Sequence, residues 1–97
     1  PAIADGRATI CTTVAALIDT NVLVYRVDPR VPAKQAAATR LLRDGLANQS
    51  VRLPHQAVVE FVAAVTRPIS AGKPLLDAAR ARREAEELLV QFEVLYP

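Results

Sequence analysis

The sequence predicts an α/β fold with a three-layer α/β/α arrangement, in which helices cover both faces of a central parallel sheet. Strand-like and helix-like segments alternate along the chain, as in folds whose parallel strands are joined by helices. The first strand-like segment is apolar without interruption, which is typical of a strand buried on both faces. With 97 residues, the chain is large enough for one domain at most.

The apolar segment comprises residues 14–18, and we predict that it is an interior strand of the sheet. The sequence leaves open whether residues 1–13 are a tail or lengthen this strand, so we assign the domain itself to residues 14–97. Asp19 follows the strand directly, and the small polar residues after it favour the start of a short helix.

Proline residues mark the beginnings of three longer helices, because proline suits the first helical turn. The first of these helices contains Gly45, which lowers helix propensity near its end. The last helix carries arginine–glutamate pairs at a spacing of four residues, which indicates a solvent-exposed face. The paired residues are Arg80 with Glu84, Arg82 with Glu86 and Arg83 with Glu87. The predicted helices are residues 32–48, 55–66 and 75–91, and the remaining predicted strands are residues 50–53 and 92–96.

The composition, 52% hydrophobic and 23% charged, is that of an ordinary globular chain and argues against several kinds of site. Cys11 is the one cysteine, and neither it nor His55 has the partners that a disulfide or a zinc site would need. The aromatic content of 4% argues against a stacking platform for single-stranded bases. No apolar run approaches the roughly 20 residues of a membrane span, and no signal peptide is evident, so we expect a cytoplasmic protein without membrane contact.

Two carboxylates stand in unusual places. Asp19 lies at the carboxyl end of the first strand, where ligands gather in open parallel sheets, although it could equally be a simple cap of the following helix. Glu60 lies in a helix that is apolar almost all round; alternatively, Gln56, Glu60 and Arg67 form the one solvated stripe of that helix. Two acids from separate elements can converge on one crevice and bind Mg²⁺ or Mn²⁺ there, because these ions prefer oxygen ligands.

Three stretches carry a family resemblance: "ALIDTNVLVY", the "LPHQAVVEFVAAVTRP" helix and the "PL" that opens the next helix. Together they resemble a PIN domain, and most of all the VapC-type toxins of bacterial toxin–antitoxin pairs, over residues 16–97. The resemblance implies a divalent-metal-dependent ribonuclease with Mg²⁺ or Mn²⁺ as cofactor, RNA as substrate and a cognate antitoxin as partner. Asp19 matches the first acidic ligand of the family and Glu60 the second. Thr20 and Asn21 match the small polar residues that shape the pocket beside the first acid.

The sequence departs from the family in one respect. PIN domains carry a third and often a fourth acid in their C-terminal part, whereas no later carboxylate of this chain follows an apolar run. We therefore expect residues 14–97 to be the N-terminal portion of a PIN-like domain, with an incomplete metal site and no activity by itself. Apolar surface that the absent part would cover should favour a homo-oligomer.

Basic residues give a weaker indication. Arg40, Arg43 and Arg67 are candidate contacts to RNA phosphates, although scattered arginines on helices usually only face the solvent. A second interpretation of the whole chain also stays open, in which it is a non-catalytic PIN-like module for dimerisation or for binding an antitoxin.

Overall fold

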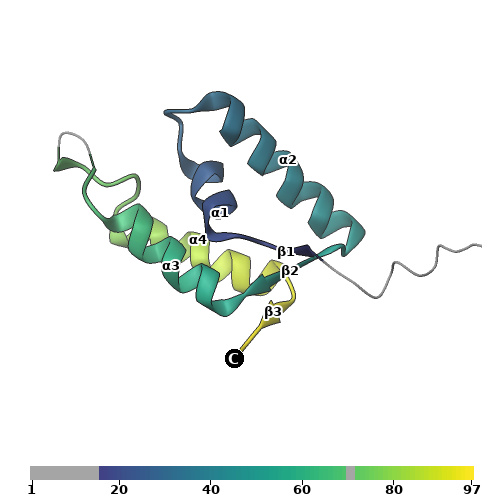
Figure 1. Cartoon of the computed structure of the whole chain (residues 1–97). Helices are drawn as coiled ribbons and strands as arrows, with labels where there is room; N and C mark the ends of the chain where they lie inside the picture. Colours follow the sequence, from purple (N-terminus) through teal and green to yellow (C-terminus); the bar gives the residue numbers. More distant parts are fainter. Residues whose placement is uncertain (1–15, 70–71) are drawn as a thin grey trace, which may run out of the picture.

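The structure, a computed structural model, describes residues 16–69 and 72–97 (Figure 1). This part of the chain is an α/β fold with a three-stranded parallel sheet and four helices. The prediction of strands and helices alternating around a parallel sheet is confirmed. The tail or strand extension predicted for residues 1–13 lies outside the described residues. The elements are, in chain order, β1 (Ala16–Leu17), α1 (Thr20–Val27), α2 (Pro32–Asn48), β2 (Val51–Pro54), α3 (His55–Thr66), α4 (Ala78–Gln91) and β3 (Val94–Leu95).

The strands lie in the order β1–β2–β3, so β2 is central and β1 lies at an edge of the described sheet. Both pairings are parallel, with Ala16 opposite Val51 in the first. The interior position predicted for residues 14–18 is therefore wrong for the part of that segment which the structure describes, and Leu17 is 62% exposed. An uninterrupted apolar run does not specify the central strand, because β2 takes that position with an alternating burial pattern.

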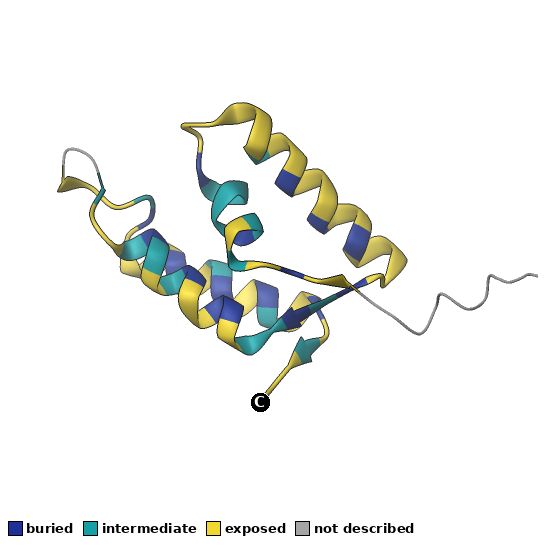
Figure 2. Ribbon diagram, viewed as in Figure 1, coloured by how far each residue is buried: buried dark blue, intermediate teal, exposed yellow. Residues whose placement is uncertain are grey.

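The described helices pack on one face of this sheet. The chain moves from β1 to β2 and on to β3 in the same direction, so right-handed crossovers leave all the connecting helices on one side. Ile18, Val51 and Leu53 are buried on that side together with residues of the helices. The alternate positions Leu17 and Leu95 are exposed, and Figure 2 shows β1 in the colour of exposed residues. Two layers are thus described, and the third layer stays a prediction.

The core is aliphatic apart from two phenylalanines, Phe61 and Phe92, and α2 reaches it through a glycine. A β-carbon on Gly45 would lie 2.8 Å from both γ-carbons of Val51. Glycine, which weakens the helix prediction at this position, therefore permits α2 to approach β2 closely. The most deeply buried side chains come from α1, β2, α3 and α4, namely Leu23, Leu53, Phe61, Val65 and Leu88.

The bounds of α2 and α3 agree with the predicted ones, whereas α4 begins later than predicted. The Asp77 carboxylate accepts a hydrogen bond of 2.7 Å from the backbone N–H of Arg80 and caps the helix. Before this cap, Leu76 is buried in non-helical chain, where its N–H donates to the carbonyl of Val65. Burial of this leucine against α3 therefore outweighs the helix-start signal of the upstream proline.

The two later strands also differ slightly from prediction. β2 is displaced by one residue, and β3 is shorter than the predicted strand over residues 92–96. Phe92 accounts for the second difference, because it is the C-cap of α4 and its N–H still bonds to the carbonyl of Leu88. Its ring is buried in the core.

One charged residue of α4 does not have the partner that the sequence suggests. Glu84 forms an ion pair with Arg26 of α1, and the two side chains are only 21% and 27% exposed. The expectation that Glu84 pairs with Arg80 on a solvated face is therefore wrong. Because α1 and α4 both pack against α3, Arg26 lies within reach of Glu84, and this contact has no signal in local spacing. The other two predicted pairs of α4 consist of exposed residues.

A second ion pair holds the turn between α1 and α2. Asp28 is 4% exposed, and its carboxylate accepts hydrogen bonds of 2.9–3.0 Å from the backbone N–H, Nε and Nη2 of Arg30. The side-chain hydrogen bonds from Arg30 lower the pKa of Asp28 from its ordinary value, although burial acts in the opposite direction. The turn is thus fixed by a carboxylate that is charged at neutral pH.

Candidate functional site

Asp19 lies at the carboxyl end of β1 and caps α1. Just before it, the N–H of Ile18 donates to the carbonyl of Arg52 at 3.0 Å and keeps the chain alongside β2. Asp19 Oδ1 then accepts a hydrogen bond of 3.4 Å from the N–H of Asn21, which is long for such a bond. The cap interpretation of Asp19 is therefore confirmed. A bond of this length uses one carboxylate oxygen weakly, and the exposed charge remains at the edge of the sheet.

Glu60 is joined to the residue that follows Asp19. The Thr20 hydroxyl donates to Glu60 Oε1 at 2.9 Å, linking the first residue of α1 to α3. The side-chain amide of Gln56, one turn earlier in α3, donates to Glu60 Oε2 at 3.3 Å. Glu60 therefore belongs both to the polar stripe of α3 and to a contact between two elements. The structure brings the Asp19–Thr20 segment and Glu60 together, and it fixes the direction of the Glu60 carboxylate from both sides.

Packing beneath the surface holds these polar groups in position. Leu23, one turn after Thr20, and Phe61, next to Glu60, are both fully buried in the shared core. The alternation of buried and exposed positions on each helix then leaves Thr20 and Glu60 at the rim of the contact between α1 and α3. The side-chain hydrogen bond is thus a consequence of apolar packing that already brings the two helices together.

The donor set is chemically suited to a hard divalent cation. Two carboxylates, the Thr20 hydroxyl and the nearby amides of Asn21 and Gln56 all offer oxygen, and Mg²⁺ in proteins is often held by one or two carboxylates together with water. Within residues 16–69 and 72–97 there is no group of three or more histidine, cysteine or acidic side chains that could hold a metal ion. The described residues therefore fit a weak, largely hydrated cation rather than a closed metal cage.

The candidate RNA-binding arginines are not gathered at this site. Arg40 and Arg43 are exposed on α2, whose C-terminal end leads into the amino end of β2, at the opposite edge of the sheet from Asp19. Arg43 lies 3.6 Å from Asp44 of the same helix. Arg67 is exposed at the C-terminus of α3. In the described chain, no hydrogen bond or ion pair links these arginines to the two acids.

Sequence reasoning missed one contact at the same edge of the sheet. His55 directly follows β2, Tyr96 directly follows β3, and the centroids of their rings are 4.9 Å apart with the planes tilted by 31°. The rule that singles out Asp19, a functional position just after a parallel strand, applies equally to these two residues. Applied to all three strands, that rule would have found them.

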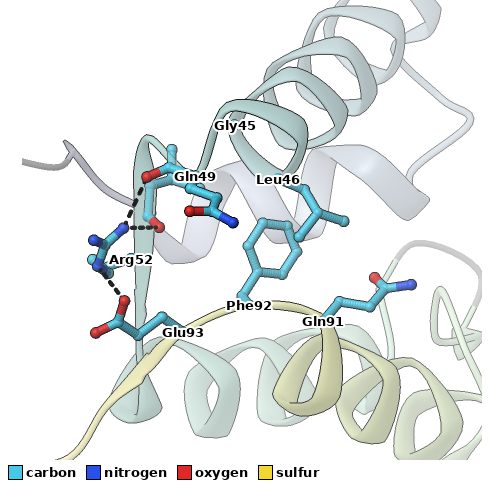
Figure 3. A pocket seen from close by; sticks show the side chains of 8 residues that line it. Gly45, Leu46, Gln49, Arg52, Gln91, Phe92 and Glu93 are labelled. Carbon is cyan, nitrogen blue, oxygen red and sulfur yellow. Dashed lines mark hydrogen bonds and ion pairs between the residues drawn. The ribbon is translucent and has the colours of Figure 1, made fainter.

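A pocket lies elsewhere, between α2, β2 and the end of α4 (Figure 3). It has a volume of about 300 Å³, and Leu46 and Phe92 form its apolar wall. Its cation, Arg52, pairs with Glu93 at 2.7 Å and donates to the carbonyls of Gln49 and Val51. Because Arg52 is already paired, this pocket offers no free charge to an anionic ligand, and neither predicted acid lines it.

Comparison of the chain with protein-family models, with curated proteins and with solved structures finds no match. The resemblance to PIN domains therefore stays a prediction that depends on the residues themselves. Among the described residues, no helix combines the length and the apolar character that a membrane crossing requires.

Proposed function

We propose that this chain carries part of a PIN-type metal site and that the protein is a divalent-metal-dependent ribonuclease, similar to the VapC toxins of toxin–antitoxin pairs. The hydrogen bond of 2.9 Å from the Thr20 hydroxyl to the Glu60 carboxylate is the observation that supports this proposal. It links the residue after Asp19 to an acid on a different helix. A glutamate that merely solvates a helix face needs no such partner on a second element.

Each residue of the site has a role in the proposed mechanism. Asp19 and Glu60 would hold Mg²⁺ or Mn²⁺, and such an ion would supply a water of lowered pKa and stabilise charge on the scissile phosphate of RNA. Thr20 and Gln56 orient the Glu60 carboxylate by donating to its two oxygens. Asn21 shapes the pocket beside Asp19. No histidine or cysteine nucleophile takes part.

The three-layer α/β/α arrangement belongs to the same proposal, with a further layer over the face that carries Leu17 and Leu95. That exposed face also favours the second candidate, a non-catalytic module that dimerises or binds an antitoxin through it, because apolar side chains that lie open to solvent promote association. The two candidates differ at Glu60. Only the ribonuclease requires its carboxylate.

Metal binding can be tested on the 97-residue chain itself. Substoichiometric Mn²⁺, a paramagnetic ion, is expected to broaden the amide resonances of Thr20, Asn21 and Glu60 in NMR spectra, and excess Mg²⁺ should reverse the broadening. Asp19→Asn and Glu60→Gln keep the shape of each side chain and remove its charge, so each should abolish the effect. Glu87→Gln on the exposed face of α4 is the matched control and should leave it unchanged.

Activity is tested with a protein that contains, besides Asp19 and Glu60, the third acid that the resemblance to PIN domains implies. There, Glu60→Gln is expected to abolish magnesium-dependent cleavage of RNA while changing the free energy of unfolding by about 0.5 kcal/mol or less, as for other exposed positions. Wild-type cleavage by the Glu60→Gln variant would rule out Glu60 as a ligand. Broadening spread evenly over all surface acids would rule out the site in this chain.

A further inference from the structure

The exposed aromatic surface of the chain is concentrated at one place. The sequence has two phenylalanines, two tyrosines and no tryptophan. Phe61 and Phe92 are buried in the core, and Tyr25 is half-buried beneath the ammonium group of Lys34, 4.8 Å from its ring centroid. Tyr96, by contrast, is 66% exposed.

Tyr96 also lies against the one histidine of the chain. The rings of His55 and Tyr96 are 4.9 Å apart between centroids, within the range of stacked or tilted aromatic pairs. His55 lies beside the tyrosine ring at a tilt of 31°, and Tyr96 as a whole remains 66% exposed to solvent. The low aromatic content argues against a stacking surface, but the fold brings the two suitable rings into one contact.

This aromatic pair shares the carboxyl edge of the sheet with the two acids. Asp19 follows β1, His55 follows β2 and Tyr96 lies just after β3, and the strands are neighbours in that order. Two strand spacings of about 4.8 Å separate the first strand end from the third, roughly 10 Å in all. Gln56, the residue after His55, donates to the Glu60 carboxylate at 3.3 Å, so the N-terminal part of α3 carries both the histidine and an acid. A short stretch of single strand covers this distance.

We propose that His55 and Tyr96 form a stacking platform for a base of single-stranded RNA, next to the phosphate that a cation at Asp19 and Glu60 would bind. The proposal rests on the function proposed above and adds a nucleotide-binding subsite to it. Single-stranded RNA is commonly bound by stacking its bases on tyrosine or histidine rings, since every base offers a π-face. The platform recognises an unstacked base and is therefore selective for single strands over duplexes.

The subsite can be tested without metal or cleavage, by fluorescence anisotropy of a labelled oligouridylate in EDTA. Stacking of one base on an aromatic ring is usually strong enough that Tyr96→Ala should weaken binding about tenfold. Tyr96→Phe keeps the ring and should retain binding, whereas His55→Ala should weaken it to a smaller extent. Val90→Ala on the exposed face of α4 is the control for substitution of a surface residue. Thermal unfolding of each variant shows whether the fold is kept.

A second probe separates bases from backbone. An abasic strand with the same number of phosphates should bind the wild-type chain about tenfold more weakly than the oligouridylate, and Tyr96→Ala should abolish this difference. Equal binding of the two probes by the wild type, or unchanged oligouridylate binding by Tyr96→Ala, would overturn the platform. The assay contains EDTA, so binding in it does not depend on a metal ion. If the wild-type chain prefers the oligouridylate in this assay but the protein shows no metal-dependent cleavage, the platform is upheld and only the ribonuclease is refuted.

Discussion

Replacing Gly45 with alanine tests the closest contact between α2 and the sheet. In an open helix this change would stabilise the protein by about 1 kcal/mol, because alanine has the higher helix propensity. Here the new β-carbon would meet both γ-carbons of Val51 at 2.8 Å, whereas carbon atoms normally pack at about 3.5–4.0 Å. Val51 cannot easily yield, since a β-branched side chain has few rotamers and its strand is central. Overpacking of this kind costs about 1–3 kcal/mol.

The net expectation for Gly45→Ala is a loss of about 1 kcal/mol in the free energy of unfolding. Urea unfolding at pH 7 measures this loss, and a thermal scan should show a melting temperature lower by about 4–8 °C. Ala47→Gly at an exposed site in the same helix calibrates the propensity term and should cost about 1 kcal/mol without any clash. The double variant Gly45→Ala/Val51→Ala should be more stable than the sum of the single effects predicts, because the smaller side chain removes the clash.

The opposite sign would refute this reasoning. If Gly45→Ala raises the free energy of unfolding by the full 1 kcal/mol of helix propensity, α2 does not approach Val51 as closely as the structure has it. If the double variant is simply additive, the two positions are not in contact.

Two further predictions concern the turns at the ends of helices. Asp28→Asn should lower the free energy of unfolding at pH 7 and flatten the loss of stability in acid, as urea unfolding between pH 3 and 7 can show. The pKa of Asp28 is lowered in the folded state, so its carboxylate stabilises the fold above the ordinary carboxyl pKa of about 3.9. This stabilisation is lost as the pH falls through the pKa of the folded state. Gln49 caps α2 with a left-handed φ of 53°. Gln49→Gly should therefore raise the free energy of unfolding by about 0.5–1 kcal/mol, and Gln49→Asn should raise it by less. An unchanged or lower free energy of unfolding for the glycine variant would contradict the left-handed cap.

Local sequence signals were sufficient for the helices whose ends are set locally. α2 and α3 begin at or beside a proline and end where their helix-forming pattern ends, and both were predicted with their observed bounds. The start of α4 was missed because two signals compete there, and burial of Leu76 against α3 moves the start to the Asp77 cap. Which of two candidate starts prevails depends on a tertiary contact, and no local window contains that contact.

The order of the strands and the partners of charged residues depend on the whole fold. The apolar residues 14–18 suggested an interior strand, yet β1 is an edge strand and Leu17 is exposed in the described sheet. Glu84 pairs with Arg26 of a helix far away in the sequence rather than with a residue one turn away. In both cases the sequence specifies whether a residue is apolar or charged. Which residues it contacts depends on how the chain connects the strands of the sheet.

The proposed ligands were chosen from the sequence, whereas the aromatic contact at the same end of the sheet was missed. Asp19 and Glu60 were chosen because a carboxylate that interrupts an apolar segment is costly to bury unless something pairs with it, whereas Thr20 was chosen only for its match to the family. His55 and Tyr96 carry no such conflict. Each is unremarkable in its own segment, and only the parallel pairing of β2 with β3 brings the two rings together.

The state of Glu60 is the strongest physical argument for a site at this edge. An exposed glutamate normally keeps its rotamer freedom, and fixing such a side chain costs up to about 2 kcal/mol in entropy. Here both carboxylate oxygens accept hydrogen bonds, from Thr20 and from Gln56, although the residue is exposed. The Gln56 bond is one that a polar stripe also forms, whereas the Thr20 bond comes from a second element. A cation ligand benefits from that bond, because a carboxylate that is already oriented binds without a further loss of entropy. Thr20→Val, which removes the hydroxyl and keeps the shape, should therefore weaken Mn²⁺ binding while Asp19 and Glu60 remain in place.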